Sequence, residues 1–170
     1  ASSFFSGNTY RIKDNSSSLS SDNLISYYEE LHKQYNILYL EDPLAEDDWN
    51  GWTAISNRMS QSTMIVGDDL TATNPYRLQM ALDKKAIPGI IIKPNQIGTV
   101  TEALAVVEMA KHSGLKIIVS HRSRETNDDF IADFATAISA DYVKFGGLAR
   151  GERIAKYNRL LQIERNIRSL

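Results

Sequence analysis

The stretch Gly89-Ile90-Ile91-Ile92-Lys93 decides the fold, because a run of three β-branched residues ends at a lysine. Consecutive isoleucines that follow a Pro-Gly pair are typical of a short strand buried on both faces, as in a parallel sheet. A lysine ammonium at the end of such a strand costs several kcal/mol if it has no partner. We therefore expect the charge of Lys93 to have a function.

Four other short apolar segments follow the same plan, in which a strand ends in polar residues and a segment with helical periodicity follows. The expected strands are Ile37–Leu40, Met64–Gly67, Gly89–Ile92, Lys116–Val119 and Tyr142–Phe145. This alternation predicts a parallel sheet with crossover helices. In a parallel α/β barrel, the carboxyl ends of all strands converge on one face.

The composition describes one globular domain and excludes several classes of protein. The chain of 170 residues is 42% hydrophobic and 24% charged, which is enough apolar material for a substantial core and argues against disorder. A net charge of -2 with interspersed signs argues against nucleic acid as a partner, and no apolar run is long enough to span a membrane. Without cysteine, metal ligands are restricted to carboxylates and histidines, and a cytoplasmic location fits.

Polar side chains stand at the carboxyl end of every expected strand. They are Glu41-Asp42, Asp68-Asp69, Lys93, Ser120-His121-Arg122-Ser123 and Lys144. Each has an ordinary interpretation when taken singly: an aspartate caps the next helix, or a lysine reaches solvent. Taken together on one rim, two acidic ends, two lysine ends and a His-Arg pair predict a charge-compensated pocket. The run Glu46-Asp47-Asp48, by contrast, is typical of a helix start.

Five motifs, in this order along the chain, resemble successive signatures of enolase, the phosphopyruvate hydratase of glycolysis. They are Leu40-Glu-Asp-Pro43 with Asp47-Asp-Trp49, Val66-Gly-Asp-Asp-Leu70 with Thr73-Asn74, Lys93 with Asn95-Gln-Ile-Gly98, Ser120-His-Arg-Ser123 with Glu125-Thr126, and Glu152-Arg153 with Ala155-Lys-Tyr-Asn158. The resemblance covers nearly the whole chain. Such a long combination of motifs in one order is very specific.

The resemblance implies a role for each polar strand end. Glu41 and Asp68 are implied as Mg²⁺ ligands, and Lys93 as the base that removes a proton beside the substrate carboxylate. Residues Ser120, His121, Arg122, Ser123 and Lys144 are implied as substrate-binding residues, with Arg122 and Ser123 at the phosphate. Asp69 matches a neighbour within its motif and not a ligand.

The implied reaction explains why these residue types are needed. Removing a proton beside a carboxylate places a second negative charge on the substrate, so positive charge must be supplied first. Mg²⁺ binds carboxylate and water oxygens and offsets such charge. A lysine base combined with Mg²⁺ is the known arrangement in the enolase superfamily, in which 2-phosphoglycerate loses water to give phosphoenolpyruvate.

The expected fold is the five C-terminal βα units of an enolase-type (β/α)₈ TIM barrel, with residues 1–170 as the C-terminal part of the barrel domain. The family's third carboxylate ligand, its proton-donating glutamate, its first barrel strands and its N-terminal capping domain would all lie upstream. A closed barrel needs eight strands, and five are visible in this sequence. We therefore expect these residues alone to be inactive and to act within a longer enolase that forms a homodimer or a larger homo-oligomer; a separate chain that carries the other half of the barrel is the alternative.

Two other functions remain open from the sequence. One is a catalytically inactive enolase-like module that serves in binding or interaction. The other is a dehydratase of the same superfamily that acts on a different acid. The Ser-His-Arg-Ser motif and Lys144 favour a phosphorylated substrate over the second alternative.

Overall fold

Five parallel strands form one sheet in the computed structural model, which describes residues 1–11 and 18–169. They are β3 (Tyr39–Glu41), β4 (Met64–Gly67), β5 (Gly89–Ile92), β6 (Lys116–Ser120) and β7 (Tyr142–Lys144). Their order in the sheet is their order in the sequence, and every neighbouring pair is parallel. The predicted parallel sheet with crossover helices is therefore confirmed.

The strand bounds differ from the predicted bounds only at the ends. Strands β4 and β5 match the prediction, while β3 begins later and includes Glu41, which pairs in register with Val66. Strand β6 continues to Ser120, because Ser120 pairs with Lys144. Phe145 was wrongly assigned to the last strand: it leaves the sheet, is fully buried and packs edge-on against Tyr157.

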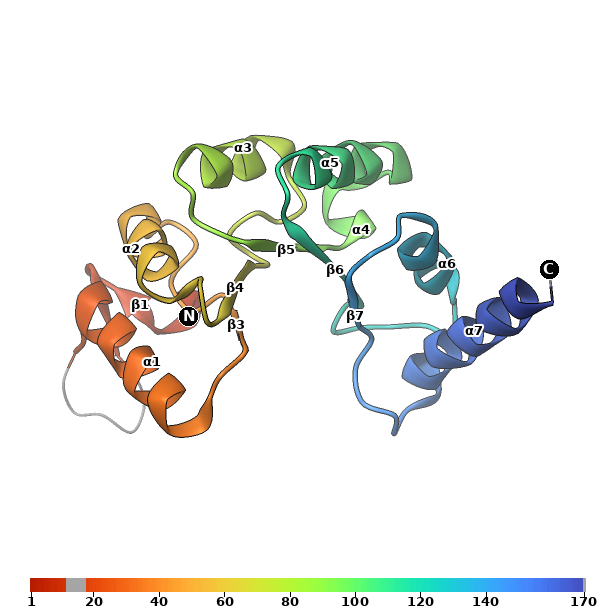
Figure 1. Ribbon diagram of the computed structural model, residues 1–170, viewed down its shortest axis with the longest axis horizontal. Coiled ribbons are helices and arrows are strands. Elements are labelled where there is room, and N and C mark those ends of the chain that lie inside the picture. The colour runs from red at the N-terminus through yellow and green to blue at the C-terminus, as the bar shows by residue number, and fades with distance from the viewer. Residues whose placement is uncertain (12–17, 170) are drawn as a thin grey trace.

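Helices surround the curled sheet on its outer side (Figure 1). They are α1 (Ser21–Tyr35), α2 (Trp49–Met59), α3 (Pro75–Asp83), α4 (Pro94–Ile97), α5 (Val100–His112), α6 (Phe130–Ala137) and α7 (Gly151–Arg168). Side-chain caps fix several of their starts. Asp48 accepts a hydrogen bond from the backbone N–H of Gly51 at the start of α2, as expected for a helix start. The cap of α3 is Asn74, and neither Asp68 nor Asp69 caps that helix.

Small elements that were not predicted include a short 3-10 helix, η1 (Ser2–Phe4), a hairpin and helix α4. A hairpin of β1 (Phe5–Ser6) and β2 (Thr9–Tyr10) turns through Gly7 and Asn8, both of which have positive φ. Its strands of two residues are too short for any periodicity to reveal. Helix α4 follows Lys93 directly, with Pro94 in its first turn, so the main chain changes direction immediately after the lysine.

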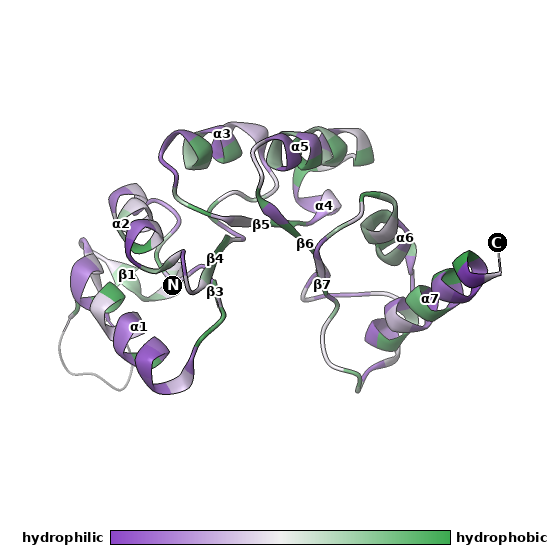
Figure 2. Cartoon of the chain, in the orientation of Figure 1, coloured by the Kyte–Doolittle hydropathy of each residue, from purple (hydrophilic) through white to green (hydrophobic). Residues whose placement is uncertain are grey.

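The isoleucines of β5 are buried on both faces of the sheet, as predicted. Ile90 and Ile92 join the large core beneath the helices, whereas Ile91 belongs to a smaller inner cluster with Val66 and Ile118. The hydropathy colouring shows hydrophobic residues on several of the strands and a mixture of hydrophobic and hydrophilic residues on the helices (Figure 2). Alternation along one strand thus stabilises two apolar layers.

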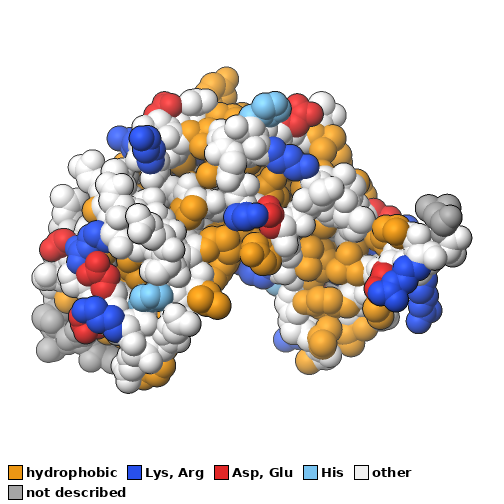
Figure 3. Space-filling model, in the orientation of Figure 1, with side chains coloured by type: hydrophobic (Ala, Val, Ile, Leu, Met, Phe, Trp, Pro, Cys, Tyr) orange, Lys and Arg blue, Asp and Glu red, His pale blue; other side chains and the backbone are white. Residues whose placement is uncertain are grey.

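The inner face of the sheet is concave and partly open. The space-filling view shows a hollow between the two ends of the molecule, with hydrophobic side chains along it (Figure 3). A cavity of about 460 Å³ on this face is lined by Leu38, Tyr39, Met64, Ile118, Tyr142, Val143 and Lys144. The architecture is that of half a barrel. None of the helices in residues 1–11 and 18–169 is long and apolar enough to cross a membrane.

Candidate active site

A polar cavity of about 340 Å³ lies where the carboxyl ends of the five strands meet. It is lined by Glu41, Asp68, Asp69, Lys93, Gln96, Ser120, His121, Arg122, Ser123 and Lys144. All eight residues to which the resemblance assigns a role in metal binding, proton removal or substrate binding are in this set, whereas Asp42, also expected at this rim, is not. The structure therefore brings the predicted residues together, while the role of each remains a prediction.

Carboxylates and ammonium groups alternate in the cavity. The Lys93 ammonium contacts Asp68 Oδ2, and the side chains of both residues are nearly buried, with 12% and 8% exposed. The Lys144 ammonium lies 2.6 Å from Glu41 Oε1 and 3.9 Å from Asp68 Oδ2. Each buried charge is thus compensated by an opposite one, as an interior of low dielectric requires.

The side chain of Glu41 is oriented by Tyr39, a residue of the same strand, β3. The Tyr39 hydroxyl donates a hydrogen bond of 2.9 Å to Glu41 Oε2, while Oε1 faces Lys144. Burial raises the pKa of Tyr39, and the bond to the Glu41 carboxylate raises it further. Tyr39 therefore stays protonated and continues to donate to Glu41 throughout the physiological pH range.

The buried carboxylate of Asp68 is the feature of the cavity that most directly suggests a bound cation. Only 6% of the residue is exposed, yet its Oδ1 has no hydrogen-bond partner among the described residues. Buried carboxylate oxygens are almost always bonded, so an unpaired one calls for an explanation. Oxygen donors from Asp68 and Glu41 fit Mg²⁺, which is bound in proteins through one or two carboxylates and several waters.

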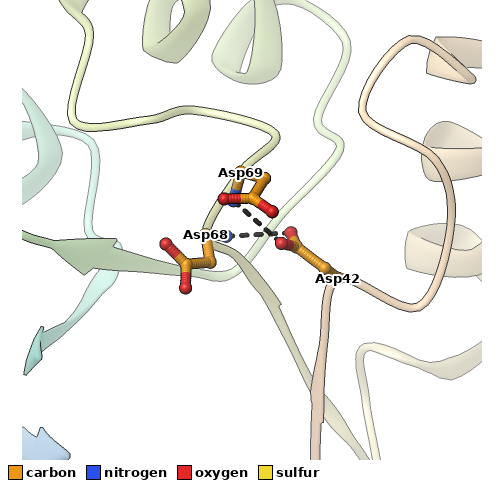
Figure 4. A group of neighbouring side chains, drawn as sticks. All are labelled: Asp42, Asp68 and Asp69. Carbon is orange, nitrogen blue, oxygen red and sulfur yellow. Dashed lines mark hydrogen bonds between the residues drawn. The ribbon is translucent and has the colours of Figure 1, made fainter. Parts of the chain in front are cut away.

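A third carboxylate, Asp42, lies near Asp68 and Asp69 but is committed to the backbone (Figure 4). Its two oxygens accept hydrogen bonds of 2.9 Å and 2.8 Å from the N–H groups of Asp68 and Asp69. Burial raises the pKa of Asp42, although these two bonds oppose the shift. The carboxylate of Asp68 points away from the other two, so we interpret Asp42 as a support for the end of β4.

Thr73 holds the backbone of Lys93, a contact that the sequence did not reveal. The fully buried Thr73 hydroxyl accepts a hydrogen bond of 2.9 Å from the Lys93 N–H and donates one of 2.8 Å to Gln96 Oε1. Thr73 has φ of 51°, which is unfavourable for a β-branched residue. The only sequence signal was its place within the Thr73-Asn74 motif.

The last residue of β6, Ser120, and the loop that follows it carry the remaining predicted residues. The His121 N–H donates to the carbonyl of Lys144 at 2.9 Å, while His121 Nδ1 is buried without a partner among the described residues. Burial lowers the pKa of His121, and the positive charge of Arg153 lowers it further. A neutral imidazole therefore lines the cavity at neutral pH.

Comparisons with known proteins agree with this geometry. Residues 1–170 match the family model described as enolase, C-terminal TIM barrel domain. A protein named enolase from Helicobacter pylori (strain HPAG1) is 47% identical over 159 residues, which cover 94% of this chain and 37% of that protein. Another named enolase, from Aeropyrum pernix, is 49% identical over 164 residues, which cover 96% of this chain and 38% of that protein.

The chain spans somewhat more than a third of the length of these curated relatives. The match extends over nearly all of the chain's own residues, and the curled parallel sheet with its outer helices is part of a barrel of the expected type. On these grounds the chain belongs to the enolase family, through its match to that family's C-terminal TIM barrel domain.

Proposed function

We propose that the cavity at the strand ends is part of the active site of an enolase, which dehydrates 2-phosphoglycerate to phosphoenolpyruvate with Mg²⁺. The observation that carries this proposal is the alternation of Glu41, Lys144, Asp68 and Lys93 around one polar cavity, where one buried oxygen of Asp68 has no hydrogen-bond partner in the part of the chain that the structure describes. Such a site supplies metal ligands and a base within reach of one small molecule.

Asp68 and Glu41 would hold Mg²⁺. Their oxygens now face the ammonium groups of Lys93 and Lys144, so the site already accommodates positive charge next to both carboxylates. When bound, Mg²⁺ supplies positive charge that offsets the second negative charge on the substrate carboxylate. Tyr39 keeps Glu41 oriented through the bond to its other oxygen.

Lys93 is the proposed base. Its side chain is only 12% exposed, so few water molecules compete for its amine, and its backbone is fixed by Thr73. In the neutral form, the amine accepts the proton from the carbon beside the carboxylate, and the electron pair of that C–H bond moves toward the carboxylate. That electron pair then returns to form the carbon–carbon double bond while the bond to the neighbouring hydroxyl breaks, and the hydroxyl takes a proton from a general acid and leaves as water.

Lys144, Arg122 and Ser123 are the proposed substrate-binding residues. Lys144 bridges Glu41 and Asp68 and so stands where the substrate carboxylate would approach the metal ligands. Arg122 and Ser123 line the same cavity, where a guanidinium and a hydroxyl suit phosphate oxygens. His121 and Ser120 complete the wall.

Other parts of the proposal concern the whole protein. We place the general acid and the third carboxylate ligand outside these 170 residues. In the longer polypeptide, residues 1–170 would form the C-terminal part of the barrel domain. The relatives named enolase are long enough to include such additional parts. A cytoplasmic homodimer or larger homo-oligomer is the proposed form.

The test is turnover by the natural polypeptide that carries these residues. We expect it to convert 2-phosphoglycerate with Mg²⁺, to stop when the metal is chelated and to leave unphosphorylated glycerate unchanged. Replacing Arg122 with methionine raises KM for 2-phosphoglycerate. Binding of Mg²⁺ and 2-phosphoglycerate without any turnover would instead support the inactive binding module, and turnover of glycerate would support a different dehydratase.

A further inference from the structure

Lys156 is a buried lysine that the proposed reaction does not use. It lies on α7, within the motif Ala155-Lys-Tyr-Asn158, and only 1% of it is exposed. Burying an ammonium group is costly unless partners compensate for the lost water. The contacts of Lys156 therefore indicate what its burial achieves.

The partners of Lys156 lie in the loop that follows β6. Its ammonium is 2.7 Å from Glu125 Oε2 and donates a hydrogen bond of 2.6 Å to the carbonyl of Thr126. Burial raises the pKa of Glu125, but the Arg122 N–H and the Lys156 ammonium outweigh this effect, so the pKa of Glu125 is lowered overall. Glu125 is therefore ionised at neutral pH, with its carboxylate against the side-chain nitrogen of Lys156.

Glu125 connects Lys156 to Arg122, one of the proposed phosphate-binding residues. Its Oε1 accepts a hydrogen bond of 2.7 Å from the backbone N–H of Arg122. One carboxylate thus joins Lys156 on α7 to the main chain of Arg122 in the cavity wall.

Arg153, one turn earlier on α7, holds the carbonyls of the same segment. Its guanidinium donates to the carbonyl of Arg122 at 2.9 Å and to that of Ser123 at 3.2 Å. Gly146 makes room for this side chain, since a Cβ there would lie 3.0 Å from Arg153 Cδ. Both backbone polar groups of Arg122 are therefore bonded, directly or through Glu125, to side chains of α7.

A purely architectural role for the ion pair is the alternative. Helix α7 has other attachments, because the Tyr157 hydroxyl donates to the carbonyl of Gly146 at 2.7 Å and Arg159 forms a salt bridge of 2.7 Å with Asp133. These contacts bind α7 to the strand end and to α6 without the buried pair. Fastening the helix therefore does not explain why a lysine is buried beneath the loop.

We propose that Lys156, acting through Glu125, is a positioning residue that sets the main chain of Arg122 and Ser123 for binding the phosphate group of the substrate. This inference rests on the proposed function, because that function identifies the bound group as the substrate phosphate. The contacts of Lys156 with Glu125 and Thr126 are independent of the proposed function. A displaced loop would weaken phosphate binding in the ground state and the transition state alike, so KM changes more than kcat.

The experiment compares Lys156→Met with Lys111→Met, which alters an exposed lysine on α5, in the natural polypeptide that carries these residues. We expect Lys156→Met to raise KM for 2-phosphoglycerate about tenfold, the usual order for loss of a supporting contact, with a smaller change in kcat. Lys111→Met leaves both constants unchanged. An unchanged KM in folded Lys156→Met, or a loss confined to kcat, overturns the proposal.

Glu125→Gln keeps the test decisive if Lys156→Met fails to fold. Glutamine retains an acceptor for the Arg122 N–H but loses the charge that faces Lys156. We therefore expect a smaller rise in KM than in Lys156→Met, and an unchanged KM overturns the proposal.

Amide hydrogen exchange of residues 120–127 gives a readout that needs no turnover. We expect faster exchange in Lys156→Met and Glu125→Gln than in Lys111→Met, and equal rates contradict the inference. Absence of turnover in the wild type would refute the proposed function alone.

Discussion

Lys144 and Glu41 are in contact at 2.6 Å although 103 positions of sequence separate them. They lie on β7 and β3, the two edge strands of the five-stranded sheet, which have no backbone pairing with each other. The sheet must therefore curl strongly enough for the carboxyl ends of its edges to meet. This curl gathers charges from separate βα units around one cavity.

Mg²⁺ is expected to stabilise the protein through Asp68. A ligand that binds only the folded state at 100 times its Kd adds about 2.7 kcal/mol to the free energy of unfolding. Thermal unfolding of the natural polypeptide with and without Mg²⁺ measures this gain, and we expect Asp68→Asn to lose most of it.

Asp69→Asn is the matched control for the metal prediction. Asp69 is exposed and adjacent to Asp68, and its carboxylate lies on the side of Asp42 (Figure 4). We expect this variant to keep the stabilisation by Mg²⁺. Equal losses in the two variants would place the ion among the three aspartates and would contradict the assignment to Glu41 and Asp68.

His121 predicts a pH dependence of stability. Burial and the charge of Arg153 lower its pKa in the folded state, so between the folded and unfolded pKa values the unfolded state binds more protons. The free energy of unfolding therefore falls as the pH drops through about 6.5, the ordinary value of histidine. Urea unfolding at several pH values measures this slope, and His121→Gln should make it shallower. The same slope in the variant would assign it to other groups.

Asp42 is expected to stabilise the fold through the backbone of β4. In Asp42→Asn, one of the two carboxylate oxygens that accept the N–H groups of Asp68 and Asp69 becomes an amide nitrogen. We expect the free energy of unfolding to fall by about 1–3 kcal/mol, the cost of an unsatisfied donor. Asp47→Asn, at an exposed side chain, should change it by less than about 0.5 kcal/mol. Similar small effects in both variants would refute the supporting role of Asp42.

The concave apolar face predicts self-association of the 170-residue chain. Leu38 is 68% exposed and Tyr142 is 52% exposed on this face. Contiguous exposed apolar surface of this kind favours association. We expect the double substitution Leu38→Lys and Tyr142→Lys to reduce the mean mass in sedimentation, whereas Tyr76→Lys, at a tyrosine outside this face, should not. Equal effects would assign the association to another surface.

The sheet and the residues that line its polar cavity, Gln96 excepted, were predictable from the sequence, and the physical reason is periodicity. Runs such as Gly89–Ile92 are short, β-branched and bounded by a Pro-Gly pair, so they indicate buried strands. Parallel strands place their carboxyl ends on one face, which was enough to group Glu41, Lys93 and Lys144. The family resemblance, and not the periodicity, supplied their individual roles.

The supporting contacts were not predictable, because they depend on side-chain directions in three dimensions. Lys156 entered the sequence reasoning only as part of the Ala155-Lys-Tyr-Asn158 motif, yet it is buried against the loop after β6. Thr73 and Asp42 use hydrogen bonds to backbone groups that no spacing in the sequence reveals. Tertiary contacts of this kind need the fold itself.

The most direct test of the proposed site is exchange of the hydrogen beside the substrate carboxylate with solvent deuterium. In the natural polypeptide with Mg²⁺ and 2-phosphoglycerate, we predict that exchange accompanies turnover and that Lys93→Met slows both by at least about 100-fold while Mg²⁺ still stabilises the folded protein. Exchange at the wild-type rate in folded Lys93→Met would contradict the account, because another group would then be removing the proton.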